Sequence, residues 1–154
     1  MLHILESGRV VQVREPLAGP NDATENGNWI DVSNAHAVYI VVNTAESAAA
    51  NYTLRVLEFD GTTTRAITAN ARIFHNTNTA LNELLTRQAD GLNLAITGSS
   101  LNKLTVFQVD PARVSAGYDR VTLQVDSTPG NVDATGQVIG AVGYVLPARY
   151  KQSR

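Results

Sequence analysis

Three histidines are the clearest metal-ligand candidates in this sequence, but they lie far apart along the chain. His3, His36 and His75 form neither a His-x-His nor a His-x-x-x-His pair. Those are spacings that place two imidazoles on one face of a strand or a helix, as zinc and non-haem iron sites usually require. The sequence contains no cysteine, which excludes thiolate ligands, thiolate nucleophiles and disulfides. We therefore expect no metal site and no cofactor.

A serine nucleophile and a phosphate-binding loop are also hard to place. The sequence lacks the G-x-S-x-G elbow, and the nearest stretch, residues 97–100, lacks its strand–serine–helix frame. Gly136, Gly140 and Gly143 lack the GK[ST] ending of a phosphate loop and lie in a strand pattern, where glycine marks a bulge, a bend or close backbone approach. The carboxylates are scattered, mostly in turns, and no catalytic pair stands out. We expect that the protein is not an enzyme.

Composition narrows the classes of partner. A chain of 154 residues fits one domain and is long enough to bury a core without a disulfide or a metal. The net charge of −2 argues against a nucleic-acid partner, which would require a clustered basic face. Charged residues make up 17%, below the typical ~25%, so the surface is rich in neutral polar groups. No signal peptide and no apolar run of membrane-spanning length is visible, so we expect a cytoplasmic site of synthesis and no membrane partner.

The elements that would position any binding residues are strands, because apolar residues recur with period two. In residues 120–126, Val121, Leu123 and Val125 alternate with polar side chains, which predicts a strand that is apolar on one face. In residues 37–43 both faces are largely apolar, which predicts a strand covered on both sides. We expect the inner faces of these two strands to share one core.

Turn signals separate these and the other predicted strands. Asn-Gly, Asp-Gly, Ala-Gly and Pro-Gly pairs recur at intervals suited to antiparallel strands, and no helical segment is long enough for a parallel crossover. The sequence therefore predicts an all-β, single-domain antiparallel β-sandwich or flattened barrel of about eight to ten strands, with at most one short helix. The further predicted strands are residues 9–14, 29–32, 52–59, 71–75, 92–96, 104–110 and 137–146.

Two segments break the simple alternation. Within residues 52–59 the apolar parity switches between Val56 and Leu57, which predicts a β-bulge there. Residues 78–90 place three leucines at helical spacing between a possible Asn78 cap and a following glycine. This segment is short and lies between strands, so it forms either one or two helical turns or an irregular connection.

The N-terminal part of the chain differs in character from the rest. We divide the sequence into residues 1–20, an N-terminal arm and first strand, and residues 21–154, a single β-domain. The arm combines apolar residues with two arginines (Leu2, Ile4, Leu5, Arg9 and Arg14). It either docks on the sheet edge of another chain or forms an edge strand of this protein's own sheet. Trp29 is either a core aromatic or an interface anchor.

The order of several short motifs resembles a known family. The quoted segments are Ser7-Gly8-Arg9-Val10-Val11, Glu15-Pro16-Leu17, Asn28-Trp29-Ile30-Asp31-Val32, Tyr52-Thr53-Leu54-Arg55-Val56-Leu57, Val109-Asp110-Pro111-Ala112, Gly117-Tyr118-Asp119-Arg120-Val121 and Gly143-Tyr144-Val145-Leu146-Pro147-Ala148-Arg149-Tyr150. This order is similar to that of small structural proteins encoded in the head gene clusters of tailed bacteriophages. The resemblance runs from about residue 7 to about residue 150, with no matching motif in residues 66–79.

The resemblance implies a capsid decoration (cement) protein. Such a protein binds the outer surface of the assembled capsid, often as a homotrimer, and stabilises it by bridging subunits of the major capsid protein. It is assembled in the host bacterial cytoplasm and resides on the virion. A bridging protein of this kind gains affinity from many symmetric weak contacts. The candidate interface residues are Leu2, Ile4, Leu5, Arg9, Arg14, Trp29, Arg149 and Tyr150.

Two alternatives remain open at this point. A tail-tube, neck or head-fibre component is also a particle protein, but a tube subunit would expose a longer hairpin than residues 15–28 or 44–51 provide. A carbohydrate-binding β-sandwich would need exposed aromatic side chains, and most of the nine aromatic residues fall at core parity.

Overall fold

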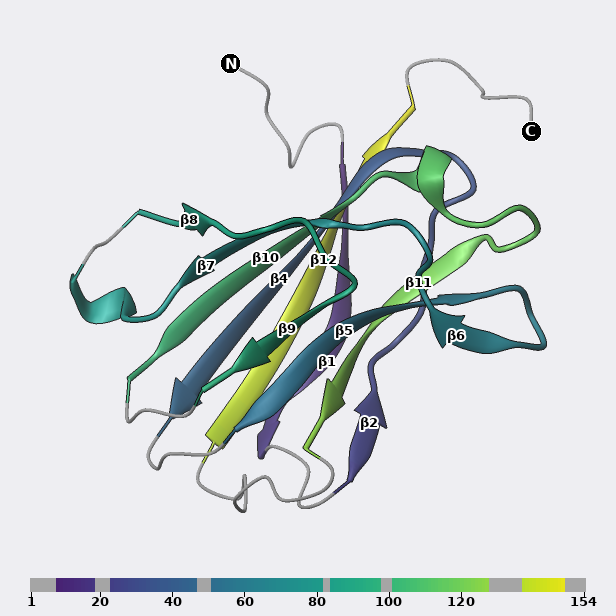
Figure 1. Ribbon diagram of the computed structural model, residues 1–154. Helices are drawn as coiled ribbons and strands as arrows, with labels where there is room; N and C mark the ends of the chain where they lie inside the picture. The colour runs from purple at the N-terminus through teal and green to yellow at the C-terminus, as the bar shows by residue number, and fades with distance from the viewer. Residues whose placement is uncertain are drawn as a thin grey trace.

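Two antiparallel sheets pack against each other in the computed structural model, which describes residues 8–18, 23–46, 51–81, 84–97, 101–127 and 137–148. Figure 1 shows the two layers, with β5 and β11 in one layer and β4, β10 and β12 in the other. Every strand pair in the described chain is antiparallel, as expected for strands joined by turns rather than by crossover helices. The predicted all-β sandwich is confirmed.

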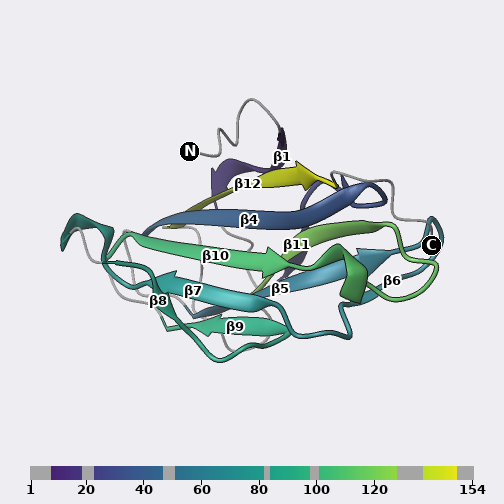
Figure 2. The same ribbon diagram turned by 90° about the horizontal axis from the view of Figure 1, so that it is seen from above.

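The first sheet, sheet A, contains the longest strands. Its order is β1-β12-β4-β10-β7-β8, and Figure 2 shows this succession from β1 to β7 across one layer. The strands are β1 (Arg9–Ala18), β4 (Ala35–Glu46), β7 (Arg72–Asn76), β8 (Thr86–Arg87), β10 (Lys103–Val109) and β12 (Gln137–Pro147). The first and last strands of the described chain, β1 and β12, thus lie side by side.

The second sheet, sheet B, is built around β11 and β5. Its order is β2-β11-β5-β6, with β3 also paired to β11 and β9 also paired to β5. The strands are β2 (Thr24–Asn26), β3 (Ile30–Asp31), β5 (Tyr52–Phe59), β6 (Thr64–Ala66), β9 (Asn93–Ile96) and β11 (Arg120–Asp126). Several of these strands are only two to four residues long, so the described chain has more strands than the eight to ten predicted.

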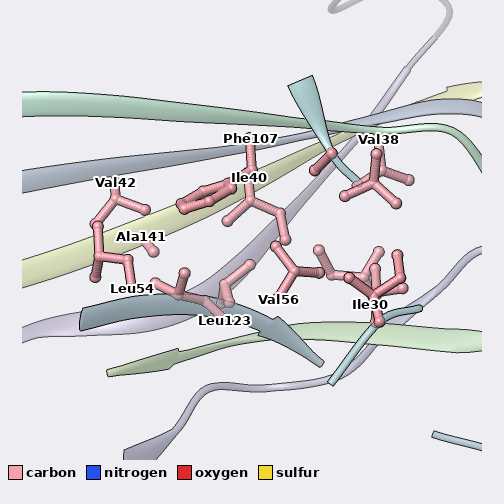
Figure 3. Close-up of a cluster of buried hydrophobic side chains, with 14 of the residues drawn as sticks. Ile30, Val38, Ile40, Val42, Leu54, Val56, Phe107, Leu123 and Ala141 are labelled. Carbon is pink, nitrogen blue, oxygen red and sulfur yellow. The ribbon is translucent and has the colours of Figure 1, made fainter. Parts of the chain in front are cut away.

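One hydrophobic core lies between the sheets. Figure 3 shows Val42, Ile40 and Phe107 of sheet A facing Leu54 and Leu123 of sheet B. All are at most 1% exposed. The predicted inner faces of β4 and β11 belong to this one cluster, so that prediction is confirmed. Burial of a side chain of this size contributes about 1.5–3 kcal/mol, which makes the core the main source of stability.

Glycine makes the close approach of the two layers possible at one position of β12. A Cβ atom at Gly143 would lie 2.5 Å from Cδ1 of Ile30 and 3.3 Å from Cγ2 of Val13. A larger residue at this position would therefore require the Ile30 side chain to shift. The sequence pattern predicted a bulge, a bend or close approach for glycines in this strand, and close approach is what the structure contains.

The β-bulge predicted near residues 56–57 is wrong. β5 pairs with β11 without a register shift over their whole paired length. Leu57 points away from the core, and its ladder neighbour Thr122 donates its hydroxyl to the Asn28 carbonyl at 2.8 Å. Leu57 is nevertheless only 3% exposed, so this outward position is buried as well. The switch in apolar parity therefore reflects a covered outer position and not an inserted residue.

The leucine-rich segment after β7 is not an extended helix. Its described part contains a single 3-10 turn, η1 (Thr79–Leu81), followed by the two-residue strand β8. Leu81, Leu84 and Leu85 are 64%, 88% and 38% exposed, so the helical spacing did not mark a core face. The other helical element of the described chain is also one 3-10 turn, η2 (Pro111–Arg113), capped by the Asp110 carboxylate.

The prediction that residues 37–43 are covered on both sides holds for one side. Val38, Ile40 and Val42 are fully buried against sheet B, whereas Tyr39 and Val41 on the opposite face are partly exposed. The two-sided apolar pattern is real, but no described element lies over the second face.

Candidate protein-binding surface

A pocket lies where the first and last described strands meet the start of β4. Its volume is about 330 Å³, and its lining includes Gly8, Arg9, Asp31, Ser33 and Pro147. The pocket combines one cation and one carboxylate with backbone and apolar groups. It therefore presents both polar and apolar groups to solvent.

Asp31 is held rigidly at the rim of this pocket. Its Oδ1 accepts hydrogen bonds from the Ser33 backbone N–H at 2.9 Å and from the Ser33 hydroxyl at 2.6 Å. These two bonds hold the pKa of the Asp31 carboxyl below its usual value of 3.8, with a smaller contribution from the charges of Arg9 and Arg120. The carboxylate is therefore ionised and fixed in position at neutral pH.

A chain of contacts connects the pocket to an aromatic pair on the outer side of sheet B. Arg9 Nη2 donates to the Asp31 carbonyl at 2.9 Å, and Asp31 pairs with Arg120 in the β3–β11 ladder. The Arg120 guanidinium lies 5.8 Å from the centre of the Phe59 ring, which stacks on Trp29 at 4.8 Å with an interplanar angle of 22°. We call these five residues the Arg9–Trp29 surface. Arginine and tryptophan are the residue types most enriched at the energetic centres of protein interfaces.

The structure brings together two of the predicted interface residues. Arg9 and Trp29 lie 20 positions apart in the sequence and belong to one surface; Arg9 is exposed and Trp29 is half-buried outside the core cluster. Trp29 is therefore not part of the core cluster, and its role as an interface anchor stays a prediction. The remaining predicted residues, Leu2, Ile4, Leu5, Arg149 and Tyr150, lie outside the described residues.

Arg14 lies elsewhere. Its side chain is buried, its Nε donates to the Ile139 carbonyl at 3.2 Å, and its Nη1 pairs with Glu25 Oε2 at 2.5 Å. A guanidinium engaged in this way is not available as an exposed rim contact. Its burial follows from the shifted register of β1 on β12 between Gln12 and Leu17.

β1 is an edge strand of the protein's own sheet, which is one of the two possibilities that the sequence left open for the N-terminal arm. Part of its free edge is already occupied, because the Asn28 backbone N–H donates to the Val13 carbonyl at 2.6 Å and Asn28 Nδ2 donates to the Gln12 carbonyl at 3.1 Å. Addition of a partner strand along the whole of β1 would have to displace these bonds.

Asp31, Phe59 and Arg120 were missed by sequence reasoning. They lie in three different strands and meet only through the register of β3 and β5 on β11. One sequence feature could have indicated this pair. Phe59 and Arg120 fall at positions whose side chains point away from the core, and an aromatic ring and a cation opposite each other on one sheet face form a favourable cross-strand pair.

A buried polar cluster at the far end of sheet A was also missed. Lys103 Nζ pairs with Glu46 Oε2, and both side chains are at most 3% exposed. The Tyr52 hydroxyl lies 3.0 Å from Thr44 Oγ1 and 3.2 Å from Glu46 Oε1, and burial raises the pKa of this phenol. The charges neutralise each other inside the sandwich, which identifies the cluster as structural.

Glu58 is a second buried carboxylate with a structural role. It accepts from the Ser115 backbone N–H at 3.0 Å, from the Ser115 hydroxyl at 2.6 Å and from Arg65 Nε at 2.8 Å. These bonds tie β5, β6 and the loop before β11 together. Arg65 also lies 4.3 Å from the centre of the Tyr118 ring.

Within the described ranges, no group of three or more His, Asp or Glu side chains is arranged to hold a metal ion. The same part of the chain contains no helix long and apolar enough to cross a membrane.

The aromatic side chains are distributed differently from the pattern expected from parity. Of those described, Tyr52 and Phe107 are buried in the core, whereas Trp29, Tyr39, Phe59, Phe74, Tyr118 and Tyr144 are half-buried. The expectation that most aromatics fill core positions is therefore wrong. Trp29 stacks on Phe59, and Arg65 covers Tyr118.

Comparison with known proteins finds a likeness in structure but not in sequence. No protein-family model matches the chain, and no curated protein matches it significantly. The fold is similar to that in the crystal structure of the SPBc2 prophage-derived protein YomS, with a TM-score of 0.50, 12% sequence identity and coverage of 90% of this chain and 91% of that chain. The CBM35 module from Cellvibrio japonicus Abf62 matches at a TM-score of 0.25 and 12% identity over 91% of this chain and 95% of that chain. The first likeness shows a shared fold, and the second is too weak to show one.

Proposed function

We propose that this chain is a structural protein of a tailed-bacteriophage particle that binds the outer surface of the capsid and stabilises it by bridging capsid subunits. The observation that carries the phage assignment is the shared fold, over nine-tenths of both chains, with a protein encoded in a prophage. The order of motifs between about residues 7 and 150 supports the same assignment independently.

The capsid as partner rests on the motif resemblance and on the character of the surface. A bridging protein needs contact surfaces and no reaction centre. The buried polar clusters around Glu46 and Glu58 are satisfied by groups within the chain, which suits a structural role. The Arg9–Trp29 surface offers an aromatic pair beside Arg120 and, next to Asp31, the pocket that Arg9 lines. On the proposed function this surface is a docking anchor for the major capsid protein.

The proposal includes a homotrimer on the shell and excludes catalytic activity. Three copies around a threefold axis would multiply modest single contacts into firm attachment. The protein would be made in the host cytoplasm and remain on the capsid surface of the finished virion.

Cosedimentation tests the proposed function. Purified protein is mixed with expanded, undecorated shells assembled from the major capsid protein of the same phage, and with purified tails of that phage. The expected result is saturable binding to shells at a fixed ratio and no binding to tails. Binding to tails and not to shells would overturn the capsid proposal in favour of a tail or neck component.

A matched pair of variants tests the anchor. Trp29→Ala should weaken shell binding by about tenfold or more, as truncation of an interface anchor does. Leu84→Ala removes another exposed apolar side chain from a loop outside the Arg9–Trp29 surface and should leave binding unchanged. Equal binding by both variants would place the docking anchor elsewhere.

A further inference from the structure

The side of sheet A that faces away from the core presents two continuous rows of side chains. Because strand side chains alternate, ladder partners at outward positions form rows across the sheet. The first row contains Val10, Tyr144, Tyr39, Gln108 and Arg72, and the second contains Gln12, Val142, Val41, Val106, Phe74 and Arg87. We call these eleven residues the outer face of sheet A.

This face is apolar at its centre and partly exposed. Tyr39, Val41, Val106 and Val142 each retain intermediate exposure, whereas their inward neighbours Ile40 and Phe107 are fully buried. Five strands at a spacing of about 4.8 Å give a width of roughly 19 Å from β1 to β7. A continuous apolar surface of this extent is typical of a site that contacts another protein.

The charges on this face have one sign and one location. Arg72 and Arg87 lie at the β7–β8 edge, and neither row contains a carboxylate. Arg87 also pairs with the nearby Asp90 at 3.0 Å in an exposed contact, which contributes little energy. The face therefore complements a partner that has an apolar centre and carboxylates at one margin.

A second copy of this chain does not provide that complement. Face-to-face packing about an axis across the strands would place Arg72 and Arg87 over the same arginines of the other copy. Packing about an axis along the strands would place them over β1, where the rows offer Val10 and Gln12. Neither arrangement supplies a carboxylate from the two rows, so the charge pattern favours a different protein.

We propose that the outer face of sheet A docks on an apolar, carboxylate-bordered surface of the capsid shell, with Arg72 and Arg87 opposite the carboxylates. This inference rests on the proposed function and names a second contact surface for it. Phe59 and Arg120 of the Arg9–Trp29 surface lie on the side of sheet B that faces away from the core, and Arg9 reaches Asp31 from β1 at the edge of sheet A. A sandwich with contact surfaces on opposite sides contacts two neighbouring subunits at once, which is the geometry of a bridge.

Charge reversal tests the docking face on undecorated shells of the same phage. The double variant Arg72→Glu/Arg87→Glu should bind shells about tenfold or more weakly, because two attractive contacts become repulsive. Arg113→Glu reverses an exposed arginine of η2 that lies outside the face and should bind within about twofold of wild type. Both variants should melt at the wild-type temperature, since the three arginines are exposed.

The outcomes separate the inference from the proposed function. If wild type binds shells and the double variant binds equally well, the inference is wrong and the proposed function stands. If wild type does not bind shells, the proposed function fails, and the inference fails with it.

Oxidative footprinting provides a second readout that needs no variant. Tyr39 and Tyr144 should be labelled in the free protein. On shells their labelling should fall at least about threefold, because side chains at the core of an interface lose access to solvent. Buried Tyr52 should remain unlabelled in both states. Protection of Tyr39 and Tyr144 in free protein, together with a dimer mass by light scattering, would show that a second copy occupies the face and would overturn the inference.

Discussion

Asp31 is the residue that most directly couples the pocket to the stability of the fold. Its carboxylate accepts two hydrogen bonds from Ser33, which lower its pKa below 3.8 in the folded protein. A group whose pKa is lower in the folded state stabilises the fold above its unfolded pKa. That contribution is lost as the pH falls through the folded pKa.

We predict that Asp31→Asn flattens the acid limb of the stability profile. Wild type should lose melting temperature as the pH falls below about 4, in part through Asp31. The variant should be less stable than wild type at neutral pH. Its stability should approach that of wild type at about pH 2, because the Asp31 carboxyl of wild type is then protonated and the variant has none. Thermal melts over this pH range provide the measurement, and an unchanged difference between the two proteins at all pH values would contradict the prediction.

The Lys103–Glu46 pair permits a second prediction at this scale. Lys103→Met leaves the Glu46 carboxylate buried beside a neutral side chain and should cost about 3–5 kcal/mol of unfolding free energy. The double variant Lys103→Met/Glu46→Leu removes the unpaired charge and should recover most of that loss. Urea denaturation measures both. A single variant that is as stable as wild type would show that the pair is not buried in solution.

Single residues of the candidate surface were predictable only where their type was unusual for their position. Arg9 and Trp29 stood out in the sequence because Arg9 is one of two arginines in the N-terminal arm and Trp29 is the one tryptophan. Phe59 and Arg120 did not, because their meeting depends on the register of β5 on β11, which alternation alone does not define. The Glu46–Lys103 pair was missed for the same reason, since its members are 57 positions apart.

At the scale of elements, β12 is the strand whose sequence is most constrained by packing. Gly143 lies directly under Ile30, with no room for a Cβ atom. We predict that Gly143→Ala lowers the unfolding free energy by about 1–3 kcal/mol through overpacking. Ile30→Val removes the clashing Cδ1 atom. In a double-mutant cycle it should reduce the loss of unfolding free energy caused by Gly143→Ala by at least about 0.5 kcal/mol.

A control is available in the same strand. Gly140 faces Pro16 with nearest distances of 3.2–3.4 Å, so Gly140→Ala should be tolerated better than Gly143→Ala. Equal costs at the two positions, or a cycle with no coupling to Ile30, would contradict the packing explanation.

Strands were predictable to the extent that their alternation was complete. β11 begins and ends where the pattern predicted, because it alternates over seven residues between clear turns. β5 also has its predicted bounds, although its parity switches at Leu57, because both of its ends lie at turn signals. The segment after β7 was not predictable, because three leucines at helical spacing favour a helix only if a core face is available, and these leucines are exposed. The short strands β2, β3, β6 and β8 depend on longer neighbours for pairing and carry little pattern of their own.

At the scale of the whole molecule, the two ends of the described chain meet beside the pocket. Gly8 lines the pocket, and the Ala148 backbone N–H donates to the carbonyl of Asn34, another lining residue, at 2.9 Å. Residues 1–7 and 149–154 lie outside the described residues, so a docking role for Leu2, Ile4, Leu5, Arg149 and Tyr150 stays a prediction.

We predict that deletion of residues 1–8 weakens shell binding without affecting folding. The melting temperature should be nearly unchanged, because β1 begins at Arg9 and its ladder with β12 is retained. Shell binding should fall by about tenfold or more, since the deletion removes three apolar side chains from the contact. A truncated protein that saturates shells with wild-type affinity, or that fails to fold, would contradict the role proposed for this segment.

A cryo-EM reconstruction of the native virion tests whether this β-sandwich binds the outer surface of a phage capsid. We predict sandwich-shaped density on that surface, in three copies around threefold positions, with the outer face of sheet A and the Arg9–Trp29 surface against neighbouring capsid subunits. Density of this shape in the tail tube or the neck, together with a bare capsid surface, would show that the protein is not a capsid decoration protein.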